Sequence, residues 1–573
     1  MNFKVLIILI CCFLSGKSIA NNSEKVSINL IETSDVHGNM FPFNFISLSK
    51  GSGSLARVSS FLKEQRAKFK DNCILMDNGD MLQGQPTVYY YNFIDTVSTH
   101  IAAKVMNYMK YDLGNLGNHD METGHIVYDR WISECNFPFV GANIIDKNKG
   151  IPYLKPYHII VKSGVKIAVM GMITPAIPCW LPENLWEGLY FQDMEECAKI
   201  WIEHIKKVEK PDVIVGLFHS GSSGSLLNDI VENASMNVAK NVPGFDVIFM
   251  GHDHNLLCKK IVNIVGDSVL IADPGSRANN VASINIDMFI KNRKVIKKKI
   301  DGKIVNMNKF SPDSIFMAKF SNEYDQVKKF VSERIGYISS PVSAKESFFG
   351  PSGFMDLIHD LQLRVSGADI SFTAPLSYDS KIDKGNIYVS DMFKLYSYEN
   401  MLYVMTLSGK EIKDYLEYSY SNWINTVKNE NDTLMIIKRY GRRYNFINPT
   451  FNFDSAAGIN YEVDITKPVG SRIIIKSMSD GKEFNPDNTY KVAINSYRGN
   501  GGGELLTNGA GISKDELSKR IIWSTDKDMR FYLMQYIIHE NNVIVPQLNN
   551  WKFVPEELYQ KISIKDRALI FGR

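Results

Sequence analysis

Gly251-His252-Asp253-His254 directly follows Val247-Ile248-Phe249-Met250, an apolar run that is typical of a buried parallel strand. Two histidines two residues apart therefore leave the end of a strand and enter a short loop, where Gly251 allows a tight turn. Paired histidines often only cap a surface loop, so this stretch alone is a weak indication of function. Four earlier segments show the same design, in which an apolar run stops at a residue able to bind metal.

Each of these four segments consists of an expected strand and the polar loop after it. The strands are expected at 27–32, 73–76, 113–116 and 213–218, and the loops are Asp35-Val36-His37-Gly38, Asp77-Asn78-Gly79-Asp80, Gly117-Asn118-His119-Asp120 and His219-Ser220-Gly221. Helical patterns lie between the strands, for example over 95–109 and 194–208. This alternation between about residues 26 and 300 predicts an α/β domain with a layered sheet.

Seven residues at these strand ends carry oxygen or imidazole donors and no thiolate: Asp35, His37, Asp80, Asn118, His219, His252 and His254. Such a set suits Zn, Mn, Fe or Co rather than a structural zinc site. In open α/β sheets, sites form outside the carboxyl ends of the strands. Asp80 lies in the middle of the set and is placed to bridge two ions, one held by Asp35, His37 and His254 and the other by Asn118, His219 and His252. Two metal ions about 3.5–4 Å apart stabilise the attacking and leaving oxygens in phosphoryl transfer.

Every motif also has a simpler explanation when it is taken alone. Residues 35–38 fit a turn with a helix cap, residues 118–120 fit a polar loop, and His219 fits a buried histidine with its hydrogen bonds satisfied. Five motifs in one order after five strands favour a functional site over these explanations.

The order Asp-x-His, Gly-Asp, Gly-Asn-His-Asp, His-x-Gly, Gly-His-x-His resembles the calcineurin-like metallophosphoesterases. The resemblance implies a four-layer sandwich domain over residues 21–310 that binds two divalent metal ions. It also implies that His119 and Asp120 form the catalytic pair that contacts phosphate and assists departure of the leaving group. An imidazolium held by a carboxylate is suited to stabilise an oxyanion.

The second half of the chain resembles the C-terminal domain of the 5′-nucleotidase superfamily, and most closely that of the bacterial periplasmic 2′,3′-cyclic-nucleotide 2′-phosphodiesterase/3′-nucleotidases. The matching motifs are Phe451-Asn452-Phe453-Asp454, Gly458-Ile459-Asn460-Tyr461-Glu462-Val463-Asp464 and Asn495-Ser496-Tyr497-Arg498-Gly499-Asn500-Gly501-Gly502-Gly503. The resemblance implies an α+β substrate-binding domain over 344–573 in which two aromatic side chains sandwich the base. Stacking of this kind contributes about 1–3 kcal/mol per base.

The candidates for this sandwich are Phe451 or Phe453 on one side and Tyr497 on the other. In an alternating strand, one of the two phenylalanines would instead fill the core. Further substrate-binding candidates are Asn495, Arg498, Gly501 and Gly502, the glycines because they allow close backbone approach to a ligand.

One loop departs from the pattern of the 5′-nucleotidases. Residues 373–379, Thr-Ala-Pro-Leu-Ser-Tyr-Asp, lack the Gly-Gly-x-Arg motif that supplies a phosphate-binding arginine in that group. Arg498 or Lys381 is a candidate to replace it. This departure weakens a 5′-nucleotidase assignment. The resemblance implies a cyclic phosphodiesterase/3′-nucleotidase that hydrolyses its substrate by attack of metal-activated water on phosphorus. The alternatives are a 5′-nucleotidase or nucleotide-sugar hydrolase, and a non-catalytic nucleotide-binding surface protein.

The remaining features concern export and domain linkage. Residues 1–20 have the charge, apolar core and small-residue end of a signal peptide, which predicts an exported protein, periplasmic or secreted. Bulky Ile10 before Cys11 argues against a lipoprotein, and no later run reaches membrane-spanning length. A polar helical pattern over 311–343 predicts a linker helix between the two domains.

The composition excludes some classes of partner. A net charge of +3 over 573 residues gives no indication of binding to a nucleic-acid polymer. The five cysteines after residue 20 are scattered and odd in number, which is not the pattern of a disulfide framework. The resemblance implies a nucleotide substrate as the partner, while the identity of the metal, the base preference and the oligomeric state stay open.

Overall fold

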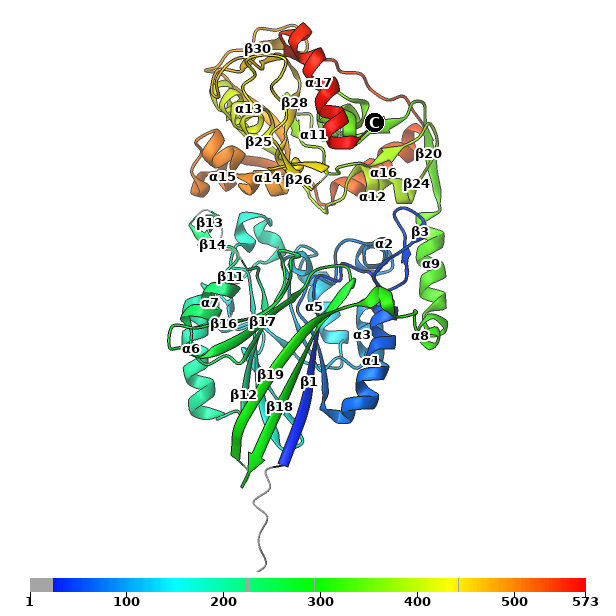
Figure 1. The fold of residues 1–573 in the computed structure, drawn as a ribbon. Helices are drawn as coiled ribbons and strands as arrows, with labels where there is room; N and C mark the ends of the chain where they lie inside the picture. The colour runs from blue at the N-terminus through cyan, green and yellow to red at the C-terminus, as the bar shows by residue number, and fades with distance from the viewer. Residues whose placement is uncertain are drawn as a thin grey trace, which may run out of the picture.

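The computed structural model describes residues 24–572 except 223, 225, 228, 293 and 442. The expected signal peptide, residues 1–20, lies outside the described residues. The described chain forms two domains, with the C-terminal domain above the N-terminal one in Figure 1. None of the described helices is long and apolar enough to cross a lipid bilayer.

Two six-stranded sheets form the centre of the N-terminal domain. The first has the order β19 (Lys294–Asn306), β18 (Asn280–Lys291), β1 (Glu24–Thr33), β4 (Cys73–Asp77), β5 (Leu113–Asn115) and β6 (Phe139–Val140). The second has the order β16 (Leu256–Val262), β17 (Ser268–Pro274), β15 (Val247–Met250), β12 (Val213–His219), β10 (Val165–Ile173) and β9 (Tyr157–Lys162). Strands β1, β4, β5 and β6 run parallel, as do β10, β12, β15 and β17. Their carboxyl ends are where the predicted ligands follow.

The two sheets pack face to face and helices cover their outer faces. One apolar cluster joins Ile28 and Leu30 of the first sheet to Ile167 of the second, so it lies between the sheets. Helices α1 (Leu55–Phe69), α3 (Ile101–Met109) and α5 (His125–Glu134) pack on the first sheet, and α6 (Met194–Val208) and α7 (Ser235–Asn241) pack on the second. Strands buried on both faces explain the nearly continuous apolar runs in the sequence. The prediction of a four-layer α/β sandwich is confirmed.

The connection between the domains differs from the expected single helix. Two short helices, α8 (Ser314–Lys319) and α9 (Ser321–Val331), are separated by Phe320, whose φ and ψ of −106° and 21° are not helical. Phe316, Phe320 and Val327 are buried in the core cluster that includes α1 and α3, so the helices pack along the N-terminal domain. Residues Arg334–Ile338 already form β20, which pairs with strands β24 (Gly385–Tyr388) and β33 (Asn542–Val543) of the C-terminal domain.

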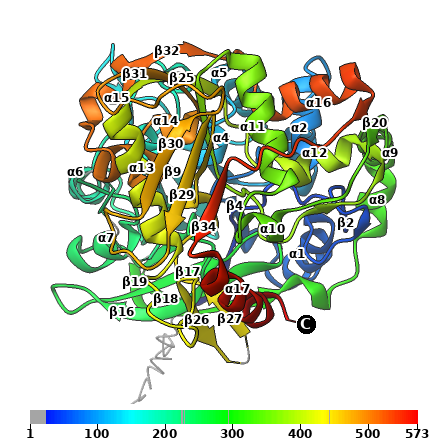
Figure 2. The same ribbon diagram turned by 90° about the horizontal axis from the view of Figure 1, so that it is seen from above.

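The C-terminal domain combines mixed sheets with helices, as the prediction of an α+β domain requires. Its largest sheet has the order β28 (Ser455–Ala457), β22 (Ile370–Thr373), β31 (Thr489–Asn495), β25 (Leu402–Ser408) and β32 (Ile521–Ser524). A second sheet, β30 (Ile473–Met478), β29 (Ile459–Asp464) and β34 (Trp551–Val554), lies beside α13 (Gly409–Trp423), as Figure 2 shows from above. Helices α11 (Gly353–Ser366), α16 (Met529–Glu540) and α17 (Glu556–Phe571) complete the domain.

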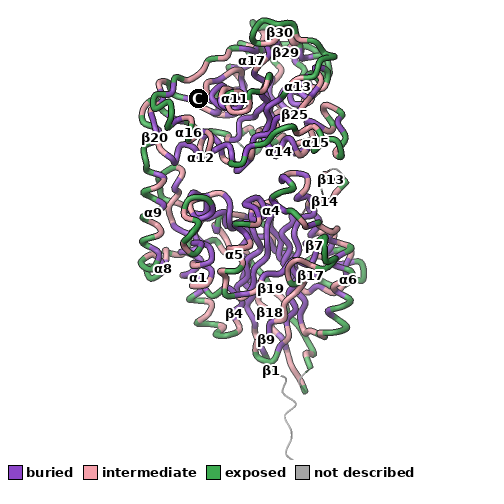
Figure 3. The backbone as a smooth tube through the Cα atoms, turned by 180° about the vertical axis from the view of Figure 1, so that it is seen from behind, coloured by how far each residue is buried: buried purple, intermediate pink, exposed green. Residues whose placement is uncertain are grey.

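Burial is concentrated in the sheets and in the loops where the two domains face each other. Figure 3 shows the buried backbone continuing through the N-terminal strands to the region of α4 (Asn118–Met121). Loops usually lie exposed on the surface of a protein, so buried polar loops need internal partners.

The five cysteines within the described chain are all free.

Phe453 lies in the core of the C-terminal domain and not on its surface. The side chain is fully buried, and its ring stacks on Trp423 with centroids 5.5 Å apart and an interplanar angle of 4°. Trp423 in turn stacks on Tyr420 at 4.9 Å. Of the two phenylalanines considered for base stacking, only Phe451 remains half-buried and available to a ligand.

Replacing Phe453 by alanine should lower the free energy of unfolding by about 3–5 kcal/mol, because the change opens a cavity inside an aromatic stack. The matched change at half-buried Phe451 should cost less than about 1 kcal/mol. Denaturant unfolding of both variants measures the difference, and equal losses would contradict this assignment of the two rings.

Candidate metal centre

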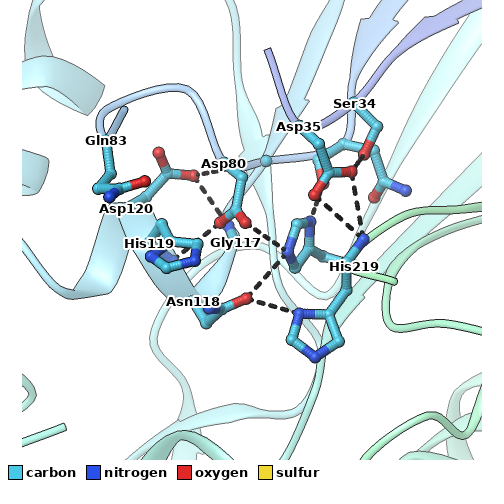
Figure 4. A network of polar contacts seen from close by, with 12 residues as sticks. Ser34, Asp35, Asp80, Gln83, Gly117, Asn118, His119, Asp120 and His219 are labelled. Carbon is cyan, nitrogen blue, oxygen red and sulfur yellow. Dashed lines mark hydrogen bonds and ion pairs between the residues drawn. The ribbon is translucent and has the colours of Figure 1, made fainter. Parts of the chain in front are cut away.

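All seven predicted ligand residues meet at the carboxyl ends of strands from both sheets. Asp35 and His37 follow β1, Asp80 follows β4 and Asn118 begins α4 directly after β5. His219 ends β12, and His252 and His254 follow β15. Figure 4 shows Asp80, Asn118 and His219 turned toward one another, with Asp35 beside them.

The first group of donors consists of Asp35, His37 and His254. His254 Nε2 lies 3.3 Å from Asp35 Oδ1 and 3.1 Å from His37 Nε2. Asp80 Oδ2 is 4.0 Å from His37 Nε2, so Asp80 borders this group.

The second group is centred on His219 and Asn118. His219 Nε2 lies 3.3 Å from Asp80 Oδ2 and 3.2 Å from Asn118 Oδ1. Asn118 Oδ1 is 2.8 Å from His252 Nδ1. Asp80 Oδ2 therefore faces both groups, which is the position required of a bridging carboxylate.

The chemistry of these donors fits two cations. Asp80 Oδ2 is buried and accepts no hydrogen bond of good geometry. His37 Nδ1 and His219 Nδ1 lie 3.0 and 2.7 Å from the backbone carbonyls of Gln83 and Asn78, which can only accept a proton. Their Nε2 lone pairs then point at the centre, where an unpaired carboxylate oxygen also points. This arrangement is characteristic of histidines that bind metal.

Electrostatics keep the central carboxylate ionised. Burial would raise the pKa of Asp80, but without bound ions the positive charges of the His219 and His119 imidazolium rings hold it well below its usual value. Bound ions would supply this charge in place of the His219 proton, which leaves His219 Nε2 free to act as a ligand. Burial lowers the pKa of His37 to about 4, so this ring stays neutral and able to act as a ligand.

Five of the seven residues adopt left-handed backbone conformations although none is glycine. Their φ angles are positive at Asp35 (51°), His37 (50°), Asp80 (58°), His252 (76°) and His254 (56°). Each such residue costs on the order of 1–3 kcal/mol and persists only where the surroundings enforce it. The concentration of this strain at one point indicates a functional site.

Gly251 has a role different from the expected tight turn, since its φ is not in the left-handed region. A Cβ atom there would lie 2.2 Å from Ser34 Oγ and 2.8 Å from Asp35 Oδ2. The absence of a side chain lets the end of β15 approach the end of β1, which brings the histidines to Asp35.

The carboxylate that contacts His119 is Glu122, not Asp120. His119 Nδ1 lies 2.6 Å from Glu122 Oε2 across one turn of helix. Burial alone would lower the pKa of His119, but Asp80 and Glu122 raise it to about 9. The His119–Asp120 pair expected from the sequence is therefore replaced by a His119–Glu122 pair. Spacing of i and i+3 on a helix is the signal that could have identified it.

Asp120 instead holds two loops together. Its Oδ1 accepts hydrogen bonds from the backbone N–H groups of Met81 and Leu82, and its Oδ2 accepts from those of Asp80 and Gly117. This carboxylate therefore fixes the loop that carries Asp80 against the loop that carries Asn118.

Two further residues at the centre carried no signal in the sequence. Glu232 Oε1 lies 2.9 Å from His252 Nε2, and its backbone carbonyl accepts hydrogen bonds from the hydroxyls of Ser220 and Thr174. This contact orients the His252 ring so that Nδ1 faces Asn118. The Trp180 ring lies 5.5 Å from the His252 ring.

A cavity of about 650 Å³ connects this centre with the C-terminal domain. Asn118, His119, His252 and His254 line it on one side, and Phe451, Tyr497 and Asn495 on the other. The Phe451 and Tyr497 rings are 6.1 Å apart and meet edge to face at 88°. Of the three glycines at 501–503, only Gly503 reaches the cavity, while Gly502 packs on the Tyr497 ring.

Neither cation considered for phosphate binding is available to the cavity. Arg498 is buried, and its five N–H groups are directed at Asp454, at Asn452 and at the carbonyls of Gly502 and Phe451. Lys381 pairs with Asp383 at 2.5 Å outside the cavity lining. Arg498 is therefore part of the core that supports Phe451 and Tyr497.

Two family models match the chain: Calcineurin-like phosphoesterase over residues 28–256, and 5′-nucleotidase, C-terminal domain, over residues 332–508. The chain is 27% identical to Trifunctional nucleotide phosphoesterase protein YfkN of Bacillus subtilis, over 93% of this chain and 39% of that protein, so it spans about two fifths of that relative. It is 24% identical to a 2′,3′-cyclic-nucleotide 2′-phosphodiesterase/3′-nucleotidase of Haemophilus influenzae, over 96% of this chain and 90% of that one. The crystal structure of a Staphylococcus aureus protein assigned as a 5′-nucleotidase has the same fold, with a TM-score of 0.76 at 21% identity over 92% of this chain and 99% of that one.

Removing the Asp80 carboxylate should empty both ion sites, because this side chain borders both groups of donors. We expect Asp80→Ala to lose both equivalents of metal and at least about 100-fold in turnover. Asn118→Ala should weaken one ion only. Elemental analysis after gel filtration measures the content, and two full equivalents in the Asp80 variant would contradict the bridging role.

The two carboxylates near His119 should respond differently to neutralisation. Glu122→Gln should lower kcat by about 10- to 100-fold with metal content and Tm retained, because it removes the charge that stabilises the His119 imidazolium. Asp120→Asn should lower stability by about 1–3 kcal/mol, because it disturbs four backbone hydrogen bonds. Full kcat in Glu122→Gln would rule out the His119–Glu122 pair.

Proposed function

The chain belongs to the calcineurin-like phosphoesterases that carry a 5′-nucleotidase C-terminal domain, and we propose that it is an exported hydrolase of 2′,3′-cyclic nucleotides and nucleoside 3′-phosphates. Members of this family hydrolyse phosphoric esters at a centre of two metal ions. The proposal of export depends on the signal-peptide pattern of residues 1–20.

One observation carries the proposal: a single cavity is lined by three of the predicted metal ligands (Asn118, His252 and His254), by His119 and by two aromatic residues of the other domain. Bound divalent ions supply positive charge for the phosphoryl oxygens and lower the pKa of water. Asp35, His37 and His254 would hold one ion, Asn118, His219 and His252 the other, and Asp80 both. The N-terminal wall carries the residues suited to ester hydrolysis, and the C-terminal wall carries the two aromatic rings. This arrangement fits a substrate with a phosphate at one end and a flat ring at the other.

His119 is the residue of this chain suited to act on the phosphate. Its Nδ1 atom faces Glu122, which leaves the Nε2 N–H for the cavity that His119 lines. An imidazolium there donates a hydrogen bond to an oxygen that gains negative charge, and can pass its proton to the departing alkoxide. Glu122 supports this by stabilising the protonated ring.

Phe451 and Tyr497 are the proposed base-stacking pair. Their rings meet edge to face with centroids 6.1 Å apart, so a base can stack between the two ring faces only after a change of side-chain rotamer. Each stacked ring would contribute about 1–3 kcal/mol and tolerates different bases, because every base has a π-face.

No arginine is among the described residues that line the cavity, which supports the 2′,3′-cyclic and 3′ esters over 5′ esters. Residues 373–379 lack the arginine motif of the 5′-nucleotidases, and Arg498 has its N–H groups occupied. Similarity over 96% of the chain to a protein named for cyclic and 3′ activities points the same way. Hydrolysis of 5′-nucleotides or nucleotide sugars is the competing proposal.

A substrate panel with added Mn, Co or Zn should give higher kcat/KM for 2′,3′-cyclic AMP and 3′-AMP than for 5′-AMP. Tyr497→Ala should raise KM for the preferred nucleotide by roughly 5- to 150-fold, the equivalent of about 1–3 kcal/mol of stacking. Hydrolysis of p-nitrophenyl phosphate, which has no base, should change far less. A preference for 5′-AMP would reject the proposed substrate, and equal losses on both esters would reject the base-stacking role.

A further inference from the structure

The charge of the cavity wall is unusual for a site that would bind phosphate. Three carboxylates are among the described lining residues: Glu122, Glu232 and Glu504. No described lining residue is a lysine or an arginine. Glu122 faces His119 and Glu232 faces His252, so these two negative charges lie beside imidazoles. Glu504 lies on the C-terminal wall among amide and aromatic side chains, where it receives a 3.5 Å contact from the Tyr418 hydroxyl.

The backbone around Glu504 fixes its position at the aromatic end. A Cβ on Gly502 would lie 2.6 Å from the Tyr497 ring, and one on Gly503 would lie 2.2 Å from both Asn452 Oδ1 and Arg498 Nη1. The turn is thus packed tightly against the ring and the buried guanidinium. Glu504 itself has a φ of 62°, a left-handed conformation that is costly for a residue with a side chain. It is followed by a π-helical turn, Leu505–Gly509, a feature often found at functional sites.

Neither of the two arginines near the cavity is among the described residues that line it. Arg498 lies behind Tyr497 with all five N–H groups directed at protein acceptors. Arg277 is exposed and outside the lining, close enough for its charge to act on Tyr398 at the cavity edge. A phosphate at the metal ligands would meet cations and His119, whereas a phosphate near Tyr497 would meet the Glu504 carboxylate.

We propose that this cavity selects nucleotides that carry a single phosphate group, and that Glu504 excludes a second phosphate from its aromatic end. The inference rests on the proposed nucleotide hydrolysis and narrows it to substrates such as a 2′,3′-cyclic or 3′ mononucleotide with a free 5′-hydroxyl. Like charges within a few ångströms of each other in a partly enclosed site repel strongly, and added salt screens this repulsion. Glu504 is therefore a specificity-determining residue.

Competitive inhibition tests this without requiring turnover of the nucleotide. Hydrolysis of bis(p-nitrophenyl) phosphate by the metal-loaded protein is inhibited with adenosine 3′-phosphate and with adenosine 3′,5′-bisphosphate, at constant free metal. At low ionic strength the bisphosphate should have a Ki at least about 10-fold higher, and the ratio should shrink as salt is added. The salt dependence is measured on the unaltered protein, so this test remains valid even if a substitution disturbs folding.

Glu504→Gln keeps the size of the side chain and removes its charge, and glutamine meets the same cost of the left-handed backbone as glutamate. It should reduce the Ki ratio by about 5-fold or more, whereas Glu483→Gln, an exposed carboxylate outside the lining, should leave the ratio unchanged. Bisphosphate binding as tight as that of the monophosphate in the unaltered protein, or an unchanged ratio in Glu504→Gln, would overturn the inference. Failure to hydrolyse 3′-AMP while the Ki ratio holds would count against the proposed function alone.

Discussion

The Asp80 carboxylate is the constraint on which the structure of the N-terminal domain depends. It is buried, ionised and surrounded by imidazoles, and its Oδ2 accepts no good hydrogen bond from the protein. Burying a charge costs several kcal/mol unless it is paired, so positive charge beside Asp80 Oδ2 stabilises the fold. Residues from the first sheet, Asp35, Asp80 and Asn118, and from the second, His219, His252 and His254, meet around this point. Metal binding would thus join the two sheets at the edge where their strands end.

The same constraint accounts for the local irregularities. The left-handed backbone at five donor residues is energetically unfavourable when each residue is considered singly. A glycine such as Gly251 occurs in many loops and does not by itself indicate a site. Together they turn side chains from two sheets toward one volume. Asp120 contributes by holding the two loops that carry Asp80 and Asn118, which leaves Glu122 as the partner of His119. The C-terminal domain adds the opposite wall of the cavity, and its buried Arg498 supports the aromatic rings there.

Much of this could be predicted from the sequence, because strand-end motifs are short and local. The apolar runs predicted the strands closely, and β15 begins and ends at the expected residues. The seven donors were identified because parallel strands place their following loops at one edge. Contacts between distant segments were not predictable. Nothing near Glu232 indicated that it would face His252, and the choice between Phe451 and Phe453 depended on packing against Trp423. Phe320 carries the helical spacing of its neighbours, yet its burial against the N-terminal domain accompanies a break in the linker helix.

A crystal structure of the protein with Mn and adenosine 3′-phosphate tests the central claim most directly, because an anomalous difference map locates the metal ions. The account predicts two anomalous peaks on either side of Asp80, one beside Asp35, His37 and His254 and one beside Asn118, His219 and His252. It also predicts the phosphate within reach of His119 and the adenine between Phe451 and Tyr497. A single peak, peaks away from Asp80, or a base bound elsewhere would contradict it.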